Sequence, residues 1–142
     1  MNVEASMSET SFAAAGAVRA LLRLEGAALF AAAVFLYVRS DPAWQPFAIL
    51  FLAPDLAFVF YLAGARVGAI AYNLTHSTIG PILFALLAQL VPVIAARAPV
   101  SLAFIWLAHI GFDRALGYGL KYASGFGDTH LGFIGKHRTQ PA

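Results

Sequence analysis

The stretch Trp106–Gly132, WLAHIGFDRALGYGLKYASGFGDTHLG, decides how the rest of the chain is interpreted. Its first half is apolar enough to enter a bilayer, yet the stretch carries ionisable residues within a short span, among them His109, Asp113, Arg114, Asp128 and His130. Ionisable groups at membrane depth are costly, so they usually face a protein interior or a water-filled cavity. The stretch therefore predicts a polar site inside a membrane protein.

The composition is that of an integral membrane protein. Of the 142 residues, 61% are hydrophobic and 11% are charged, whereas soluble domains carry about 25% charged residues. A helix needs about 20 residues to cross the hydrocarbon, so about four spans use up the chain. We expect one all-α domain, residues 1–142, that forms a four-span transmembrane helix bundle in the lipid bilayer. Residues 1–12 are expected to be a flexible tail, and residues 121–142 a cytoplasmic tail.

Several classes of protein and site are excluded. The chain has no cysteine, which excludes disulfides, thiolate metal sites and cysteine nucleophiles. The net charge is only +2, and the basic residues are scattered along the chain, so no nucleic-acid partner is expected. Glu4 and Glu9 stand where a secretory signal needs positive charge, which argues against a cleaved signal peptide.

Turn residues divide the apolar sequence into four predicted spans, at residues 17–38, 44–63, 67–95 and 100–120. Gly80 and Pro81 interrupt the third span, because proline cannot donate the helical hydrogen bond. We expect a kinked helix there, or a half-helix followed by a separate span. Residues 97–99 are expected to form a turn before the fourth span. The glycine-rich tail after it is predicted to be an irregular segment on the membrane surface.

The positions of the basic residues predict the orientation. Six of them lie near the end of the bundle that holds both termini: Arg19, Arg23, Arg66, Lys121, Lys136 and Arg138. Only Arg39 and Arg97 lie at the opposite end. The positive-inside rule therefore places both termini in the cytoplasm. Four tyrosines near this side are expected to form an interfacial aromatic belt: Tyr61, Tyr72, Tyr118 and Tyr122.

Each predicted span carries a polar group at a similar depth. Counting 1.5 Å per residue from the cytoplasmic ends places these groups roughly 9 to 16 Å deep. They are Glu25, Asp55, Asn73, His76, His109 and Asp113. Asn73 and His76 are three residues apart, and His109 and Asp113 are four apart, so each pair shares a helix face. The sequence therefore predicts that side chains from separate helices meet in one layer.

Three interpretations of this layer remain open. In the first, it is a structural network that holds the helices together. Glu25 would then pair with Arg23 or Arg114, Arg114 would neutralise Asp113, and the histidines would be neutral hydrogen-bond partners.

The second interpretation is a metal site. His76 and His109 would supply imidazole nitrogens and Asp55 or Asp113 a carboxylate, while His130 would fold back from the tail as another ligand. Such mixed sites suit Zn, Mn or Fe. Glu25 or the spare aspartate, Asp113, would act as the general base for metal-activated water. No HExxH motif is present to strengthen this interpretation.

The third interpretation makes His76 and His109 the axial ligands of a b-type haem. A haem also needs small residues beside the ring, which Gly80 and Gly111 offer only loosely.

Four stretches of the chain resemble an uncharacterised family of small bacterial membrane proteins, domain of unknown function 4260. They are LLRLEG (21–26), FLAPDL (51–56), YLAGARVGAIAYNLTH (61–76), and WLAHIGFDRALGYGLKY with GFGDTHLGFIG (106–135). The resemblance implies a multi-span protein of the bacterial inner membrane. It implies no catalytic residues, because the family has no established activity.

Two hypotheses from different classes follow. The first is a metal-dependent, hydrolase-like protein acting on a lipid or other amphipathic substrate, with the site open to the cytoplasm and roofed by residues 125–135. Its ligands would be His76, His109 and Asp55, with Asp113 orienting His109 and Glu25 as base. The second is a non-enzymatic accessory subunit of a larger membrane complex, whose polar residues lock its own helices.

Overall fold

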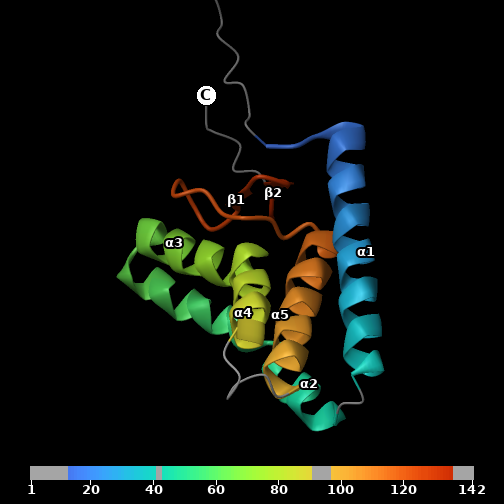
Figure 1. Cartoon of the computed structure of the whole chain (residues 1–142). Coiled ribbons are helices and arrows are strands. Elements are labelled where there is room, and N and C mark those ends of the chain that lie inside the picture. Colours follow the sequence, from blue (N-terminus) through green and yellow to red (C-terminus); the bar gives the residue numbers. More distant parts are fainter. Residues whose placement is uncertain (1–12, 41–42, 91–96, 136–142) are drawn as a thin grey trace, which may run out of the picture.

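The computed structural model describes residues 13–40, 43–90 and 97–135 (Figure 1). The helices are α1 (Gly16–Arg39), α2 (Trp44–Leu50), the 3₁₀ helix η1 (Ala53–Ala63), α3 (Ala65–His76), α4 (Ile79–Leu90) and α5 (Arg97–Leu116). Two short strands follow, β1 (Asp128–Thr129) and β2 (Gly132–Phe133). The predicted helical class is therefore confirmed. The predicted flexible tail, residues 1–12, lies outside the described residues.

Two segments among the described residues are long and apolar enough to cross a membrane: α1, with 24 residues, and Trp44–Ala63, with 20. A third span exists if α3 and α4, which are bent by 46°, are one broken crossing. The protein is therefore a membrane protein with two to three candidate spans. A fourth crossing, on α5, stays a prediction.

The break in the third segment lies earlier than Gly80 and Pro81. Helix α3 ends at His76 and α4 begins at Ile79, so both residues belong to the first turn of α4. Proline fits a first turn, where its missing N–H has no partner to lose. Pro99 likewise lies in the first turn of a helix, because α5 begins at Arg97. The predicted turn at residues 97–99 is therefore wrong. The break makes His76 the last residue of α3.

The second candidate span changes helix type part of the way along, from α2 to η1. Pro54 stands at the start of η1, which continues as a 3₁₀ helix for 11 residues. Side chains three residues apart stack in a 3₁₀ helix, so Asp55, Phe58 and Tyr61 share one face. The ring of Phe58 stacks on that of Tyr72 in α3, with centroids 5.3 Å apart. This face of η1 therefore contacts α3 while it stays partly exposed, and Asp55 lies at its beginning.

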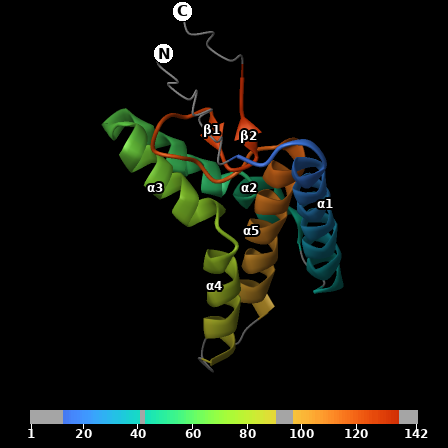
Figure 2. The same ribbon diagram turned by 90° about the horizontal axis from the view of Figure 1, so that it is seen from above.

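Glycines allow α1 to lie directly against α5. A β-carbon on Gly26 would come 2.6 Å from the β-carbon of Arg114, and one on Gly111 would come 2.5 Å from the Phe30 nitrogen. Small residues at such crossings let helix backbones approach closely in lipid. Figure 2 shows α5 between α1 and α4, and α5 packs against both. Helix α5 is therefore the central element of the fold.

The glycine-rich tail is folded rather than irregular. Strands β1 and β2 pair as an antiparallel hairpin, and Lys121 forms a further bridge with Thr129. The Asn73 side chain binds the backbone of Lys121 in both directions, donating to its oxygen at 2.8 Å and accepting from its nitrogen at 2.7 Å. This pair of bonds anchors the tail across the end of α3. Residues 136–142 lie outside the described part of the chain.

Candidate metal centre

Four side chains from three helices converge at one point: Asp55 from η1, His76 from α3, and His109 and Asp113 from α5. One ligand atom from each lies within 4.8 Å of all the others. The Nε2 atom of His76 lies 3.1 Å from Nε2 of His109, 3.3 Å from Oδ1 of Asp55 and 3.4 Å from Oδ2 of Asp113. The convergence predicted for Asp55, His76, His109 and Asp113 is therefore present.

The burial of the four side chains is uneven. His76 and His109 are 3% and 1% exposed, while the side chains of Asp113 and Asp55 are 15% and 31% exposed. Helix periodicity accounts for the pair on α5, because residues four apart share a face. The histidines therefore form the inner wall of the site, and Asp55 lies at its open side.

Hydrogen bonding defines the protonation of the His76 ring. Its Nδ1 lies 3.0 Å from the carbonyl oxygen of Tyr72 and 2.9 Å from Oγ1 of Thr75. A carbonyl only accepts, so Nδ1 carries the proton and donates it. The Nε2 atom then presents a lone pair to Asp55, His109 and Asp113. Metal-ligating histidines characteristically donate their other ring proton to a backbone carbonyl in this way.

Tyr72 is part of the site, which the sequence interpretation missed. It was expected in an interfacial belt, but it is 1% exposed. Its hydroxyl donates to Oδ2 of Asp113 at 3.0 Å, and its ring stacks on His76 with centroids 3.6 Å apart. The spacing of four residues between Tyr72 and His76 is the signal that places both on one helix face.

The buried side chain of Lys121 lies over the ring of Tyr72. Lys121 is 4% exposed, and its Nζ lies 4.8 Å from the centre of the Tyr72 ring and 4.1 Å from that of Phe126. Nζ donates to the Phe126 carbonyl at 3.0 Å. Burial lowers the pKa of the Lys121 amine, and the carboxylates of Asp113 and Asp55 oppose that shift. The tail thus brings a basic group close to two carboxylates of the convergent group.

Glu25 and His130 lie outside the convergent group. Glu25 is exposed on α1. His130 lies in the hairpin, where its Nδ1 accepts a hydrogen bond from the Leu120 N–H at 2.8 Å. Asn73 holds the tail and does not contact the group. Asp113 contacts both histidines and Tyr72, which differs from the predicted network in which Arg114 neutralises it.

The two histidines are not arranged as axial ligands of one haem. Such ligands coordinate from opposite faces of the macrocycle, which must lie between them. The Nε2 atoms of His76 and His109 are 3.1 Å apart, and carboxylate oxygens of Asp55 and Asp113 lie 3.3 to 3.8 Å from them, in the space that the macrocycle would occupy. The Nδ1 atom of His109 is buried and has no hydrogen-bond partner among the described residues. The arrangement suits a single small cation between the two rings.

Comparison with known proteins supports the resemblance seen in the sequence. No curated protein and no solved structure matched the chain. One family model, described as Domain of unknown function (DUF4260), matches residues 19–134 and so includes the candidate membrane spans and the hairpin. Because this match covers well over half of the chain, the protein belongs to the DUF4260 family.

Proposed function

We propose that this protein is a membrane metalloprotein that binds one divalent metal ion, with Zn²⁺ as the first candidate, between Asp55, His76, His109 and Asp113. The observation that carries the proposal is that two carboxylates, which only accept hydrogen bonds, converge on Nε2 of His76. The lone pair of His76 Nε2 faces two carboxylates and a second imidazole. Ionised carboxylates have no proton to donate, so these groups repel one another unless a cation or shared protons lie between them.

Five of the six separations between the ligand atoms are close to those around a tetrahedral ion, and all four atoms lie within 4.8 Å of one another. Zinc bonds nitrogen and oxygen at about 2.0 to 2.2 Å, which places neighbouring ligand atoms of a tetrahedron about 3.3 to 3.6 Å apart. The separations here are 3.1 Å between the histidines and 3.3 to 3.8 Å from the histidines to the carboxylates. Imidazole with carboxylate also suits Mn and Fe, so the donor set names a class of metal.

A hydrolytic reaction is the activity we propose for this ion. A bound divalent ion lowers the pKa of water towards 7 and polarises a carbonyl or phosphoryl oxygen. Asp55 is the most exposed of the four ligands, so a substrate would reach the site past its carboxylate. Tyr72 orients Asp113 through its hydroxyl, and the Tyr72 carbonyl orients His76.

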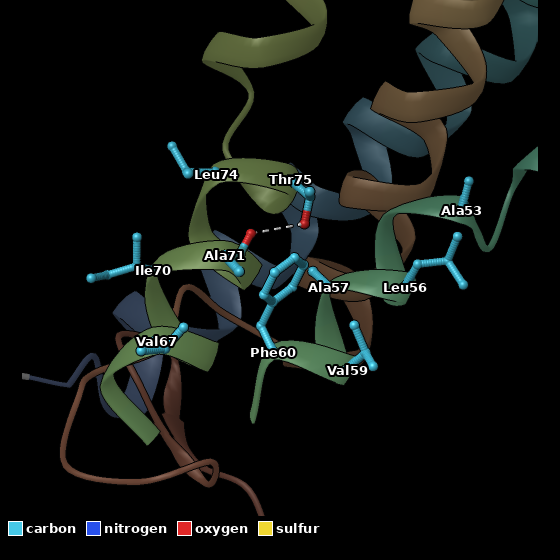
Figure 3. Close-up of a pocket in the computed structure, with 10 residues that line it drawn as sticks. All are labelled: Ala53, Leu56, Ala57, Val59, Phe60, Val67, Ile70, Ala71, Leu74 and Thr75. Atoms are coloured by element: carbon cyan, nitrogen blue, oxygen red, sulfur yellow. Dashed lines mark hydrogen bonds between the residues drawn. The ribbon is translucent and has the colours of Figure 1, made fainter. Parts of the chain in front are cut away.

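An apolar cavity beside the site supports an amphipathic substrate. It has a volume of about 640 Å³ and lies between η1 and α3 (Figure 3). Nine of its ten lining side chains are apolar, and the tenth is Thr75. Thr75 also contacts the ring of His76 at Nδ1. The cavity therefore lies behind a ligand of the proposed metal, where an acyl chain fits and a polar substrate does not.

The topology that we propose has four crossings and both termini in the cytoplasm of a bacterial inner membrane. The distribution of Lys and Arg supports it. The two ends of the described chain also lie together, because the Ala14 N–H donates to the His130 oxygen at 2.7 Å. An even number of crossings accounts for this pairing.

Metal analysis of the purified full-length chain tests the proposal. The protein is extracted in mild detergent without chelator, and metals are counted by mass spectrometry alongside a visible absorption scan. We expect about one equivalent of zinc, manganese or iron in the unmodified chain, and loss of most of it in His76→Ala and His109→Ala. The control is His130→Ala, which removes a histidine that lies outside the group and should leave the metal content unchanged.

Two outcomes of the metal analysis would contradict the proposal. A chain that folds, contains no stoichiometric metal and takes up none from buffered zinc would overturn the metal proposal. The polar group would then be a structural network, as expected of an accessory subunit. A haem absorption band would overturn the assignment of the two histidines to a single small ion.

A further inference from the structure

Two arginines on α1 bring their guanidinium groups to the same place. Arg19 and Arg23 are four residues apart, so they share one helix face. A β-carbon built on Gly117 would lie 3.7 Å from Nη2 of Arg19 and 3.9 Å from Nε of Arg23. Two cations held this close repel each other, and an anion between them removes the repulsion.

Among the described residues, the two guanidinium groups make one hydrogen bond to the protein. The Nε of Arg23 donates to the Ala115 carbonyl at 2.9 Å, at the end of α5 where a cation is favoured. The Nε of Arg19 is buried and has no hydrogen-bond partner among residues 13–40, 43–90 and 97–135. No carboxylate lies within 4.0 Å of either guanidinium in the part of the chain that the structure describes. Since a guanidinium has five N–H donors, most of them remain available to a ligand.

The positive-inside rule alone does not explain the positions of the Arg19 and Arg23 side chains. Arginines that only set topology extend from the helix end towards water and headgroups. Arg19 instead lies against the hairpin, where a β-carbon on Gly132 would come 2.9 Å from its Nη1. Gly132 has a φ of +116°, which an L side chain rarely adopts, so the backbone there is open to the guanidinium. The arginine is thus packed into a defined place.

We propose that Arg19 and Arg23 bind a phosphate group, carried either by the headgroup of an anionic phospholipid or by free phosphate. Arginine presents a planar fork of donors that matches phosphate oxygens in pairs. The pair lies in the first two turns of α1, at the end of the molecule where β1 and β2 lie (Figure 1). A candidate span begins at Gly16, so the site is at the level of lipid headgroups. It is separate from the metal centre and does not depend on it.

Native mass spectrometry of the detergent-solubilised full chain tests the site. Phosphatidylglycerol and phosphatidylcholine are each added in equal amounts, and the retained lipids are counted for the unmodified chain, Arg19→Gln and Arg23→Gln. We expect one phosphatidylglycerol to be retained by the unmodified chain, and each variant to weaken retention about fivefold or more, since one basic residue near the surface contributes about that factor. No hydrogen bond joins the Arg19 side chain to another described residue, so Arg19→Gln should preserve the fold.

The matched control is Arg66→Gln, which removes an exposed arginine at the start of α3. It changes the net charge equally and should leave retention unchanged. A second arm adds inorganic phosphate to delipidated protein and records thermal unfolding. Retention of phosphatidylglycerol identifies the lipid headgroup, and stabilisation by inorganic phosphate alone identifies free phosphate. Equal effects of Arg66→Gln and Arg19→Gln, or no binding in either arm, would overturn the proposal.

Discussion

At the scale of single residues, Tyr72 connects three parts of the candidate site. Its ring stacks on His76, its hydroxyl donates to Asp113, and its carbonyl accepts from the His76 ring. Asp55, His76, His109 and Asp113 were all identified from the sequence, because ionisable groups are conspicuous in apolar helices. Tyr72 was missed because tyrosine is common near the ends of membrane helices. The residue type alone does not distinguish a tyrosine ring that faces lipid from one that is buried.

Replacing Tyr72 with phenylalanine should weaken metal binding while preserving the stacked ring. The variant removes only the hydrogen bond to Asp113, and loss of such an outer partner typically costs 10- to 100-fold in metal affinity. Competition with a chromophoric chelator measures this affinity. Tyr118→Phe is the control, because Tyr118 is 40% exposed and lies outside the group. Equal affinities for Tyr72→Phe and the unmodified chain would show that the hydroxyl does not support the site.

At the scale of elements, the sequence predicted where helices exist better than how they end. Apolar runs identified the segments that became α1, the Trp44–Ala63 crossing and the α3–α4 pair. A kink or break was predicted near Gly80 and Pro81; α3 ends at His76 and α4 begins at Ile79, so both residues lie in the first turn of α4. The 3₁₀ geometry of η1 has no clear signal beyond Pro54. The hairpin was missed because its strands have only two residues each, and tertiary contacts such as the Asn73–Lys121 pair hold them.

Acid should loosen the hairpin through His130. Burial lowers the pKa of this ring, and its neutral Nδ1 accepts the bond from Leu120. Above the unfolded pKa of about 6.5, both the folded and unfolded states are neutral. As the pH falls below that value, the unfolded chain takes up a proton that the folded chain resists, so stability decreases. Amide exchange of residues 117–135 should therefore speed up between pH 7.5 and pH 5.5 relative to α1.

The comparison variant for this experiment is His130→Gln. Its side chain cannot titrate, yet its amide oxygen can still accept from Leu120. The pH dependence of exchange in residues 117–135 should be smaller in this variant. An unchanged pH dependence would mean that another group controls the hairpin.

At the scale of the whole molecule, the candidate metal centre joins two sets of helices. Helix η1 packs along α3, while α5 packs along α1 and α4. Asp55 and His76 come from the first set, and His109 and Asp113 come from the second. A few further contacts cross this boundary, including the indole N–H of Trp106 donating to the Thr75 carbonyl. A metal ion would therefore connect two groups of helices that otherwise share few bonds.

Removing the metal should loosen η1 and α3 more than α1 and α5. An ion present at 100 times its dissociation constant stabilises the folded state by about 2.7 kcal/mol, and the part of this that restrains η1 and α3 is lost with a chelator. Hydrogen exchange in detergent, with and without chelator, should show faster exchange in residues 53–76 and little change in residues 16–39. The His109→Ala variant should exchange quickly with and without chelator, because it lacks a ligand of the proposed metal site. If the chelator left residues 53–76 of the unmodified chain unchanged, the four side chains would hold the two sets of helices together without an ion.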